Sequence, residues 1–134
     1  MEKEFKKYTD LEVWKESRKL ASTIYTATQS FPKEELFGLT SQMRPCAISV
    51  PSNIAEGCGR FHKKESLHFF FIARGSVYEL ETQLYLASDL HFLSDTGLQI
   101  ILKQLELVRK YLNGFIRYYN RAENPTTHNS ELTT

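Results

Sequence analysis

The last third of the chain holds apolar residues at alternating intervals of three and four positions. The series consists of Leu98, Ile101, Leu105, Val108, Leu112, Phe115 and Tyr119. This spacing lays one apolar seam along an α-helix, and such seams interlock between helices that cross at about +20°. The sequence therefore predicts a helix over about 95–121 that packs within a helical bundle.

A second seam of the same spacing lies between about residues 63 and 90. Its members are Phe70, Ala73, Val77, Leu80, Leu84 and Ala87. Only residues 89–94 separate the two predicted helices, and a connection this short makes them antiparallel neighbours. Ser94 or Asp95 is the expected N-cap of the later helix.

Two more helices are expected in the first half of the chain. The first should begin after Thr9 or Asp10, either of which can cap it, and should end before Pro32. Its helically spaced positions are Val13, Trp14, Leu20, Ala21, Ile24, Ala27, Thr28 and Phe31. The second follows Gly38 or Thr40, and its expected core face comprises Met43, Ala47, Val50 and Ile54, with Gly57 and Gly59 as its stop.

No segment shows the alternating pattern of a β-strand. The predicted fold is all-α, an antiparallel up-down-up-down four-helix bundle over residues 9–121. Residues 1–8 are charged and aperiodic, which favours a flexible N-terminal arm. Residues 122–134 are rich in Asn, Thr and Ser, so we expect a disordered C-terminal tail.

The second predicted helix contains an interior proline, Pro51, within the segment Ile48–Gly57. Proline removes one backbone hydrogen bond and crowds the carbonyl four residues earlier, at a cost of about 3 kcal/mol. We therefore predict a proline-kinked second helix that depends on tertiary packing. Pro45 marks an earlier point where this helix kinks or begins.

The composition excludes several classes of protein. The 17 basic and 16 acidic side chains nearly cancel, so only local charge can attract nucleic acid. The first residues lack the apolar core of a signal peptide, and the apolar run Phe69–Ala73 is too short to cross a bilayer. The sequence therefore predicts a cytoplasmic protein without a membrane partner.

No set of residues is sufficient for a named chemistry. Glu65 and His68 form one Glu-x-x-His element of a di-metal bundle site, but no second copy exists. Cys58 and His62 have the spacing of half a zinc site, but no second pair is spaced to complete it. Cys58 has no evident base or oxyanion donor that would make it a nucleophile. Cys46 is expected in the core and Cys58 at a partly exposed position. We therefore predict no enzymatic activity, no metal site and no cofactor.

Three segments together resemble a bacterial family first noticed in intervening sequences of 23S rRNA genes, the S23-type four-helix-bundle proteins. They are Leu11–Lys15, Ser49–Gly57 followed by Gly59 and Arg60, and Ile72–Leu84. The resemblance covers about residues 8–120. It implies a bundle that assembles into a ring, usually a homopentamer.

A related branch of that family, the accessory proteins of diversity-generating retroelements, binds nucleic acid and a reverse transcriptase. The family name records gene location, and for most members the molecular function is not established. The partners that the resemblance implies are further copies of the chain, RNA or DNA, and a nucleic-acid enzyme.

Basic residues gather in two places that are candidates for binding nucleic-acid phosphates. Around the start of the third predicted helix these are Arg60, Lys63, Lys64 and Arg74, and along the fourth they are Lys103, Arg109, Lys110, Arg117 and Arg121. The alternative is an ordinary solvated face, with cations that complement the helix dipole at a C-terminus.

A stripe of aromatic residues at seven-residue intervals lies off the core seam of the third predicted helix. It comprises Phe71, Tyr78, Tyr85 and Phe92. A helix that is apolar on two faces must bury both, so we predict a subunit interface here. The alternative is a wide core face covered by residues 32–38. Gly75 within this helix is interpreted as a site of close helix–helix approach.

Ser49, Asn53 and Glu56 share one polar face of the second predicted helix. We predict a structural role, in which a serine relaxes the backbone near Pro51 while Asn53 and Glu56 bond a neighbouring helix. The alternative is a recognition patch.

Two functions fit these observations. The first is a non-enzymatic, ring-forming protein that acts as a nucleic-acid-associated adaptor, above all for RNA. The alternative is an oligomeric scaffold that binds other proteins and no nucleic acid.

Overall fold

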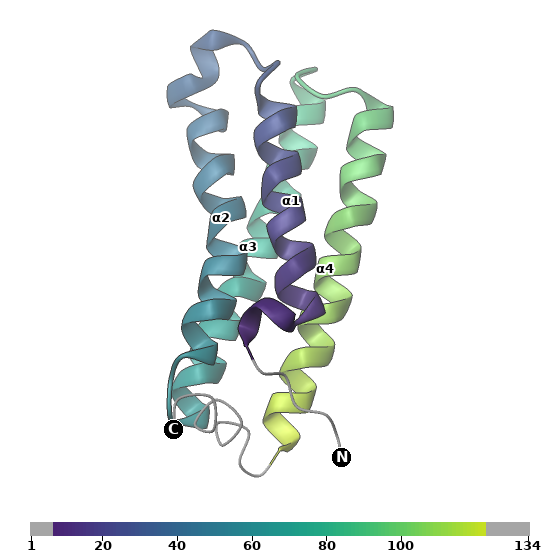
Figure 1. The fold of residues 1–134 in the computed structure, drawn as a ribbon. Coiled ribbons are helices and arrows are strands. Elements are labelled where there is room, and N and C mark those ends of the chain that lie inside the picture. The colour runs from purple at the N-terminus through teal and green to yellow at the C-terminus, as the bar shows by residue number, and fades with distance from the viewer. Residues whose placement is uncertain (1–6, 123–134) are drawn as a thin grey trace.

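The computed structural model describes residues 7–122 and contains four long α-helices (Figure 1). They are α1 (Glu12–Thr28), α2 (Leu39–Cys58), α3 (Lys63–Asp89) and α4 (Asp95–Arg121). Two 3₁₀ turns, η1 (Tyr8–Asp10) and η2 (Lys33–Phe37), precede α1 and α2. No strand occurs among these residues, so the prediction of an all-α four-helix bundle is confirmed.

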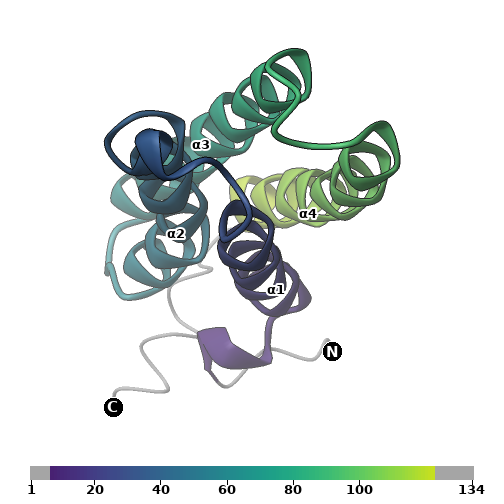
Figure 2. The ribbon, with the colours of Figure 1, turned by 90° about the horizontal axis from the view of Figure 1, so that it is seen from above.

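Consecutive helices run in opposite directions in Figure 1, and Figure 2 shows them at the four corners of the bundle. α1 packs against α2 and α4, and α3 packs against α2 and α4, with the most extensive contact between α2 and α3. α1 and α3 therefore lie at diagonal corners. Within residues 7–122, no helix carries a stretch long and apolar enough to cross a membrane.

The predicted seams form the core. All six seam residues of α3 and all four of α2 are buried, as are Val13, Leu20, Ile24, Thr28 and Phe31 from the N-terminal segment. In α4 the seam is buried except for Phe115, which is half-buried beside the buried Ile116. Ser17 is also buried, and its hydroxyl is satisfied by donating to the carbonyl of Trp14 at 3.0 Å.

The cap predictions have mixed outcomes. Ser94 caps α4, since its hydroxyl accepts the backbone N–H of Gly97 at 3.0 Å. For α1 the prediction is wrong, because the N-cap is Leu11 and no side chain caps it. Asp10 instead accepts the backbone N–H of Lys7 and closes η1. The predicted arm and tail lie outside the described residues, apart from Lys7 and Tyr8 at one end and Ala122 at the other.

Both prolines lie inside α2, which begins at Leu39, well before Pro45. Pro51 cannot donate to the carbonyl of Ala47, so this turn of the helix lacks one hydrogen bond. Nearby, the Ser49 hydroxyl donates to the Cys46 carbonyl at 2.8 Å, and the Asn53 amide donates to the Ser49 carbonyl at 2.8 Å. Side chains thus add hydrogen bonds around the proline turn, while the kink itself stays a prediction.

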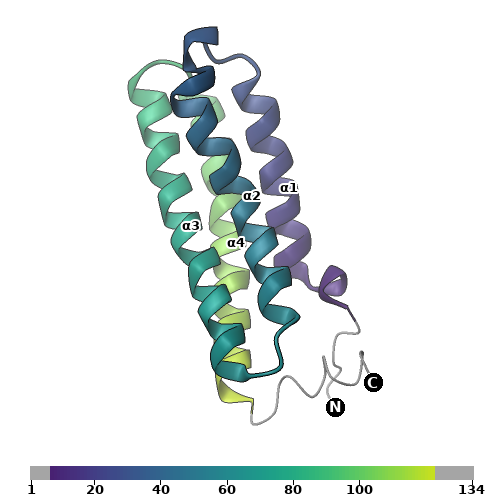
Figure 3. The same ribbon diagram turned by 90° about the vertical axis from the view of Figure 1, so that its left-hand side faces the viewer.

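Gly57 allows α2 and α3 to approach closely near their connection, which Figure 3 shows from the side. A Cβ atom at this position would lie 2.5 Å from Cε1 of Phe70 and 2.8 Å from the carbonyl oxygen of Ser66. At Gly75, by contrast, a Cβ would meet nothing within 4 Å. The prediction that Gly75 serves a close approach inside the bundle is therefore wrong, and Gly57 has that role.

Alanine substitutions at the two glycines should have opposite effects. Gly57→Ala forces Phe70 or the α3 backbone to move, and should lower the free energy of unfolding by about 1–3 kcal/mol. Gly75→Ala replaces a poor helix former in open space, and should raise it by about 0.5–1 kcal/mol. Urea denaturation at low protein concentration, followed by circular dichroism, measures both.

The two variants make the same chemical change, so each is the control for the other. If Gly57→Ala unfolds at the same urea concentration as the wild type, the close approach of α2 and α3 contributes nothing to stability.

Candidate nucleic-acid interface and exposed faces

Four cations line the outer face of α4. Lys103, Lys110, Arg117 and Arg121 are all exposed, and their intervals of seven, seven and four residues keep them on one side of the helix. None of the four forms an ion pair with a carboxylate in residues 7–122. We call this set the α4 basic stripe.

Arg109, the fifth basic candidate on α4, is bound by carboxylates of the protein itself. Its guanidinium donates to both carboxylate oxygens of Glu81 in α3, at 2.9 and 3.2 Å, and also bonds Glu106. Its carbon Cζ lies 4.9 Å from the ring centroid of Tyr78. Hydrogen bonding by Arg109 lowers the pKa of the Glu81 carboxyl, and the two carboxylates raise the pKa of Arg109. Arg109 therefore joins α3 to α4 and leaves the set of free cations.

The basic residues around the start of α3 are also mostly engaged. Arg60 pairs with Glu56 at 2.5 Å and covers the ring of Phe69 at 4.7 Å. Lys63 donates to the carbonyl of Ala122 at 3.1 Å, just after the end of α4. These contacts tie the ends of helices together rather than present charge to a ligand.

The two remaining candidates of this group behave differently. Arg74 donates to the Asn113 side chain in α4 at 3.3 Å and lies over the ring of Phe71 at 5.1 Å. Lys64 is exposed and makes no ion pair within the described chain. Among the described residues, Lys64 is thus the one member of the predicted cluster without an ion-pair or hydrogen-bond partner, and the cluster does not form a continuous basic surface.

The polar face of α2 has structural contacts, although not all those predicted. The Ser49 hydroxyl shares a hydrogen bond of 2.5 Å with the Ser76 hydroxyl of α3. Asn53 and Glu56 were expected to bond a neighbouring helix, and this is wrong. Asn53 bonds a carbonyl of its own helix, and Glu56 pairs with Arg60, one helical turn later.

The aromatic stripe is exposed over most of α3. Phe71, Tyr78 and Tyr85 are 45%, 51% and 49% exposed, and Ile72 and Leu86 beside them are also exposed. We call these five residues the α3 apolar face. The segment 32–38 does not cover it, so the predicted alternative of a wide core face is wrong.

Phe92 does not belong to this face. α3 ends at Asp89, and Phe92 lies beyond it with its ring centroid 5.5 Å from that of the buried Phe31. The seven-residue count continued past the end of the helix, where helical spacing no longer holds. Phe92 therefore packs at one end of the core and does not contribute to the predicted interface.

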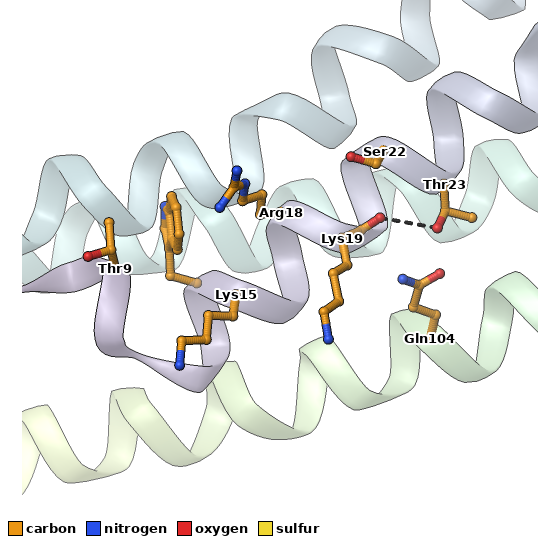
Figure 4. Close-up of a pocket in the computed structure, with 8 residues that line it drawn as sticks. Thr9, Lys15, Arg18, Lys19, Ser22, Thr23 and Gln104 are labelled. Atoms are coloured by element: carbon orange, nitrogen blue, oxygen red, sulfur yellow. Dashed lines mark hydrogen bonds between the residues drawn. The ribbon is translucent and has the colours of Figure 1, made fainter.

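A groove that the sequence did not predict lies on the outside of α1. It is lined by Trp14, three cations, three hydroxyl side chains and Gln104 of α4 (Figure 4). The cations are Lys15, Arg18 and Lys19, and the hydroxyl residues are Thr9, Ser22 and Thr23. Its volume of about 700 Å³ falls in the range of small-molecule sites, roughly 300–1,000 Å³. A tryptophan beside cations at helical spacing was the available signal, but Trp14 was grouped with the other helically spaced apolar positions of this helix.

Both cysteines are buried, so the expectation of a partly exposed Cys58 is wrong. Burial raises the pKa of each thiol to about 12, and at Cys46 the nearby Glu79 adds to this effect. At neutral pH both thiols are therefore protonated and poor nucleophiles. Among the described residues, no group of three or more His, Cys, Asp or Glu side chains is placed to hold a metal ion.

The chain matches the family model described as 23S rRNA-intervening sequence protein over residues 9–114. No curated protein matches the chain at a significant level. The matched region spans α1, α2, α3 and most of α4, together with the groove and the α3 apolar face.

The Glu81–Arg109 pair should contribute more to stability than an exposed pair. Its side chains are only 23% and 13% exposed, whereas those of Glu12 and Lys15 are 63% and 48% exposed. Glu81→Gln should lower the free energy of unfolding by about 1–2 kcal/mol, and the control Glu12→Gln by less than about 0.5 kcal/mol. Chemical denaturation at pH 7 measures both.

The effect of Glu81→Gln should also depend on pH. The folded pKa of Glu81 lies below its unfolded value of about 4.3, so its contribution is complete above that pH. It is lost as the pH falls through the folded pKa, and the difference between wild type and Glu81→Gln should then shrink. A difference that stays constant from pH 7 to pH 3 would contradict this account.

Proposed function

Because the chain belongs to the family of 23S rRNA-intervening sequence proteins, we propose that it is a non-enzymatic, ring-forming bundle that binds nucleic acid, RNA above all, as an adaptor. The family description supports an association with RNA genes and names no activity. The proposal for this chain therefore rests on its own surface.

The α4 basic stripe is the observation that carries the proposal. Its four cations have no carboxylate partner within residues 7–122, and the first and last lie 18 positions apart, or roughly 27 Å at the rise of an α-helix. A net charge of +1 gives no expectation of such a surface. Glu56 pairs with Arg60, and Glu81 and Glu106 pair with Arg109, so these carboxylates do not neutralise the stripe. When cations along an exposed helix contact phosphates, the nucleic acid releases its condensed counterions, and this release drives binding.

The α3 apolar face supports the ring. Its rings and aliphatic side chains are about half exposed in the single chain, and apolar area of this kind favours association. Gly75 lies in the same exposed region, between Phe71 and Tyr78, and has open space where a Cβ would be. A glycine at mid-helix costs up to about 1 kcal/mol, which a close approach by another subunit would offset. The resemblance of the sequence implies five subunits.

The second candidate function is a protein-binding scaffold without nucleic acid. The α3 apolar face favours it, since an apolar surface needs no phosphate partner. The α4 basic stripe binds phosphates in the adaptor and has no nucleic-acid partner in the scaffold. Both functions require the chain to assemble.

Assembly should depend on the α3 apolar face. Tyr85→Glu combined with Leu86→Glu places two charges in the interface, at side chains that make no hydrogen bond or ring contact of their own in the described chain. The variant should form smaller species that remain fully helical. Light scattering measures the mass, and circular dichroism the helicity.

Ile100→Glu is the matched control, because Ile100 is 61% exposed and lies on α4, away from this face. It should assemble like the wild type. If the wild type is a monomer of 15.6 kDa at micromolar concentration, the proposed ring assembly is wrong.

Binding to nucleic acid should depend on the α4 basic stripe. Lys110→Glu with Arg117→Glu should weaken binding at least tenfold at low salt. It should reduce the slope of log K against log salt by about 1.4 for single strands and 1.8 for duplexes. Fluorescence anisotropy with labelled RNA and DNA, at several salt concentrations, provides both values.

Lys33→Glu, compared with Lys110→Glu alone, controls for the change in net charge, since Lys33 is exposed on η2. It should leave binding nearly unchanged. If the wild type binds neither RNA nor DNA at low salt, the adaptor proposal fails and the scaffold takes its place.

A further inference from the structure

We propose that the groove on α1 is a binding site for single-stranded nucleic acid, in which Trp14 stacks on a base and Lys15, Arg18 and Lys19 hold the adjoining phosphates. This inference rests on the proposed function and deepens it. It names the surface that contacts a base, and it specifies a single strand as the ligand.

The helical register brings the required groups together. Trp14 and Arg18 are four residues apart, as are Lys15 and Lys19, so the pairs lie on successive turns. The buried side of α1 is formed by Val13, Ser17, Leu20 and Ile24, and the groove lies on the other side. Trp14 is half-buried against the core and lines the groove. Lys15, Arg18 and Lys19 are exposed and line the same groove (Figure 4).

Trp14 is held in place rather than free to rotate. Its ring contacts that of Tyr8 edge-to-face, with centroids 5.4 Å apart and an interplanar angle of 76°. The guanidinium carbon of Arg18 lies 5.3 Å from the Trp14 ring centroid. An indole and a guanidinium together offer flat surfaces on which unpaired bases stack.

The charges of the groove are available to phosphates. Arg18 forms no ion pair with any carboxylate of the described chain. Lys15 lies 3.7 Å from Glu12 and Lys19 lies 3.4 Å from Glu16, in pairs whose lysines are 48% and 67% exposed. In the Lys15–Glu12 pair both side chains are exposed, and such pairs contribute only about 0–1 kcal/mol, so a phosphate can displace Glu12. The Glu16 side chain is only 16% exposed, so Lys19 is the more firmly paired of the two lysines.

Polar groups at the rim add hydrogen-bonding capacity. Ser22 is exposed, and Gln104 rises from α4 on the far side of the groove (Figure 4). A glutamine amide both donates and accepts, so it can bond the edge of a base or a sugar hydroxyl. Neither side chain makes a hydrogen bond within the described chain.

The groove also adjoins the α4 basic stripe. Lys103 of the stripe directly precedes Gln104 of the groove, and α4 packs beside α1 along the bundle. One strand can therefore contact the stripe through its phosphates and place a base on Trp14. A duplex hides the faces of its bases, which is why a single strand is the expected ligand.

Trp14 is the only tryptophan of the chain, so its fluorescence reports directly on the groove. The wild type is titrated at low salt with a ten-nucleotide single-stranded RNA, the matching DNA, an RNA hairpin and inorganic polyphosphate. We expect quenching by the single strands and at least tenfold weaker binding of the hairpin. Quenching and equally tight binding by polyphosphate would overturn the stacking role.

Variants then separate charge from stacking. Lys15→Gln with Arg18→Gln and Lys19→Gln should reduce the slope of log K against log salt by about 2 for a labelled single strand. Trp14→Phe should keep most of the affinity, and Trp14→Ala should lose roughly tenfold. Lys15→Gln with Lys19→Gln touches only exposed positions and gives a result even where Trp14→Ala fails to fold.

The outcomes distinguish this inference from the proposed function. If the wild type binds and Lys110→Glu with Arg117→Glu abolishes binding, while Trp14 emission and the α1 variants are unaffected, the groove is not the site and the adaptor proposal stands. If an acidic peptide quenches Trp14 and the single strands do not, the groove binds protein and the inference is wrong. If nothing binds at low salt, both proposals fail.

Discussion

Near the α2–α3 connection, Gly57 faces the ring of Phe70 at a separation that leaves no room for a Cβ atom. Phe70 in turn packs edge-on against Phe115 and Tyr119 of α4, with both centroid distances 5.0 Å. One close contact between α2 and α3 thus fixes a ring that also sets the position of α4. Since α4 carries the basic stripe and one wall of the groove, the placement of both surfaces depends on this contact.

The arginines of the bundle show how a nearly neutral chain acquires a basic surface. Arg60, Arg74 and Arg109 each lie over an aromatic ring and each bond a second side chain, so their charge stabilises contacts within the protein. Planar guanidinium groups suit such combined stacking and hydrogen bonding better than lysine does. Within residues 7–122, cations without a carboxylate partner include Arg18 on α1 and the four residues of the α4 basic stripe. Net charge is therefore a poor guide to partners here, since the carboxylates of residues 7–122 pair with some cations and not with others.

The sequence predicted the bundle well because a buried seam must follow the period of the helix, and the bounds of α3 and α4 agree with that pattern. It failed where a residue's role depends on a distant part of the chain. Gly57 and Gly75 look alike in sequence, and only the position of Phe70 distinguishes them. Phe92 continued a seven-residue count past the end of α3, and Leu11 rather than Thr9 or Asp10 became the cap of α1. The groove was missed because Trp14 is only half-buried, between the core and solvent.

The two exposed surfaces occupy opposite parts of the molecule, and this shapes how they can work together. α1 and α3 lie at diagonal corners of the bundle, so subunits that meet through the α3 apolar face leave the outer face of α1 pointing away from that contact (Figure 2). A shallow groove with two or three phosphate contacts binds weakly when it acts alone. Several copies on one assembly raise the effective concentration of each further groove for the same strand, so the affinity of the whole exceeds that of one site. Assembly through α3 and weak binding through α1 and α4 are thus complementary, because the first multiplies the second without occupying the same surface.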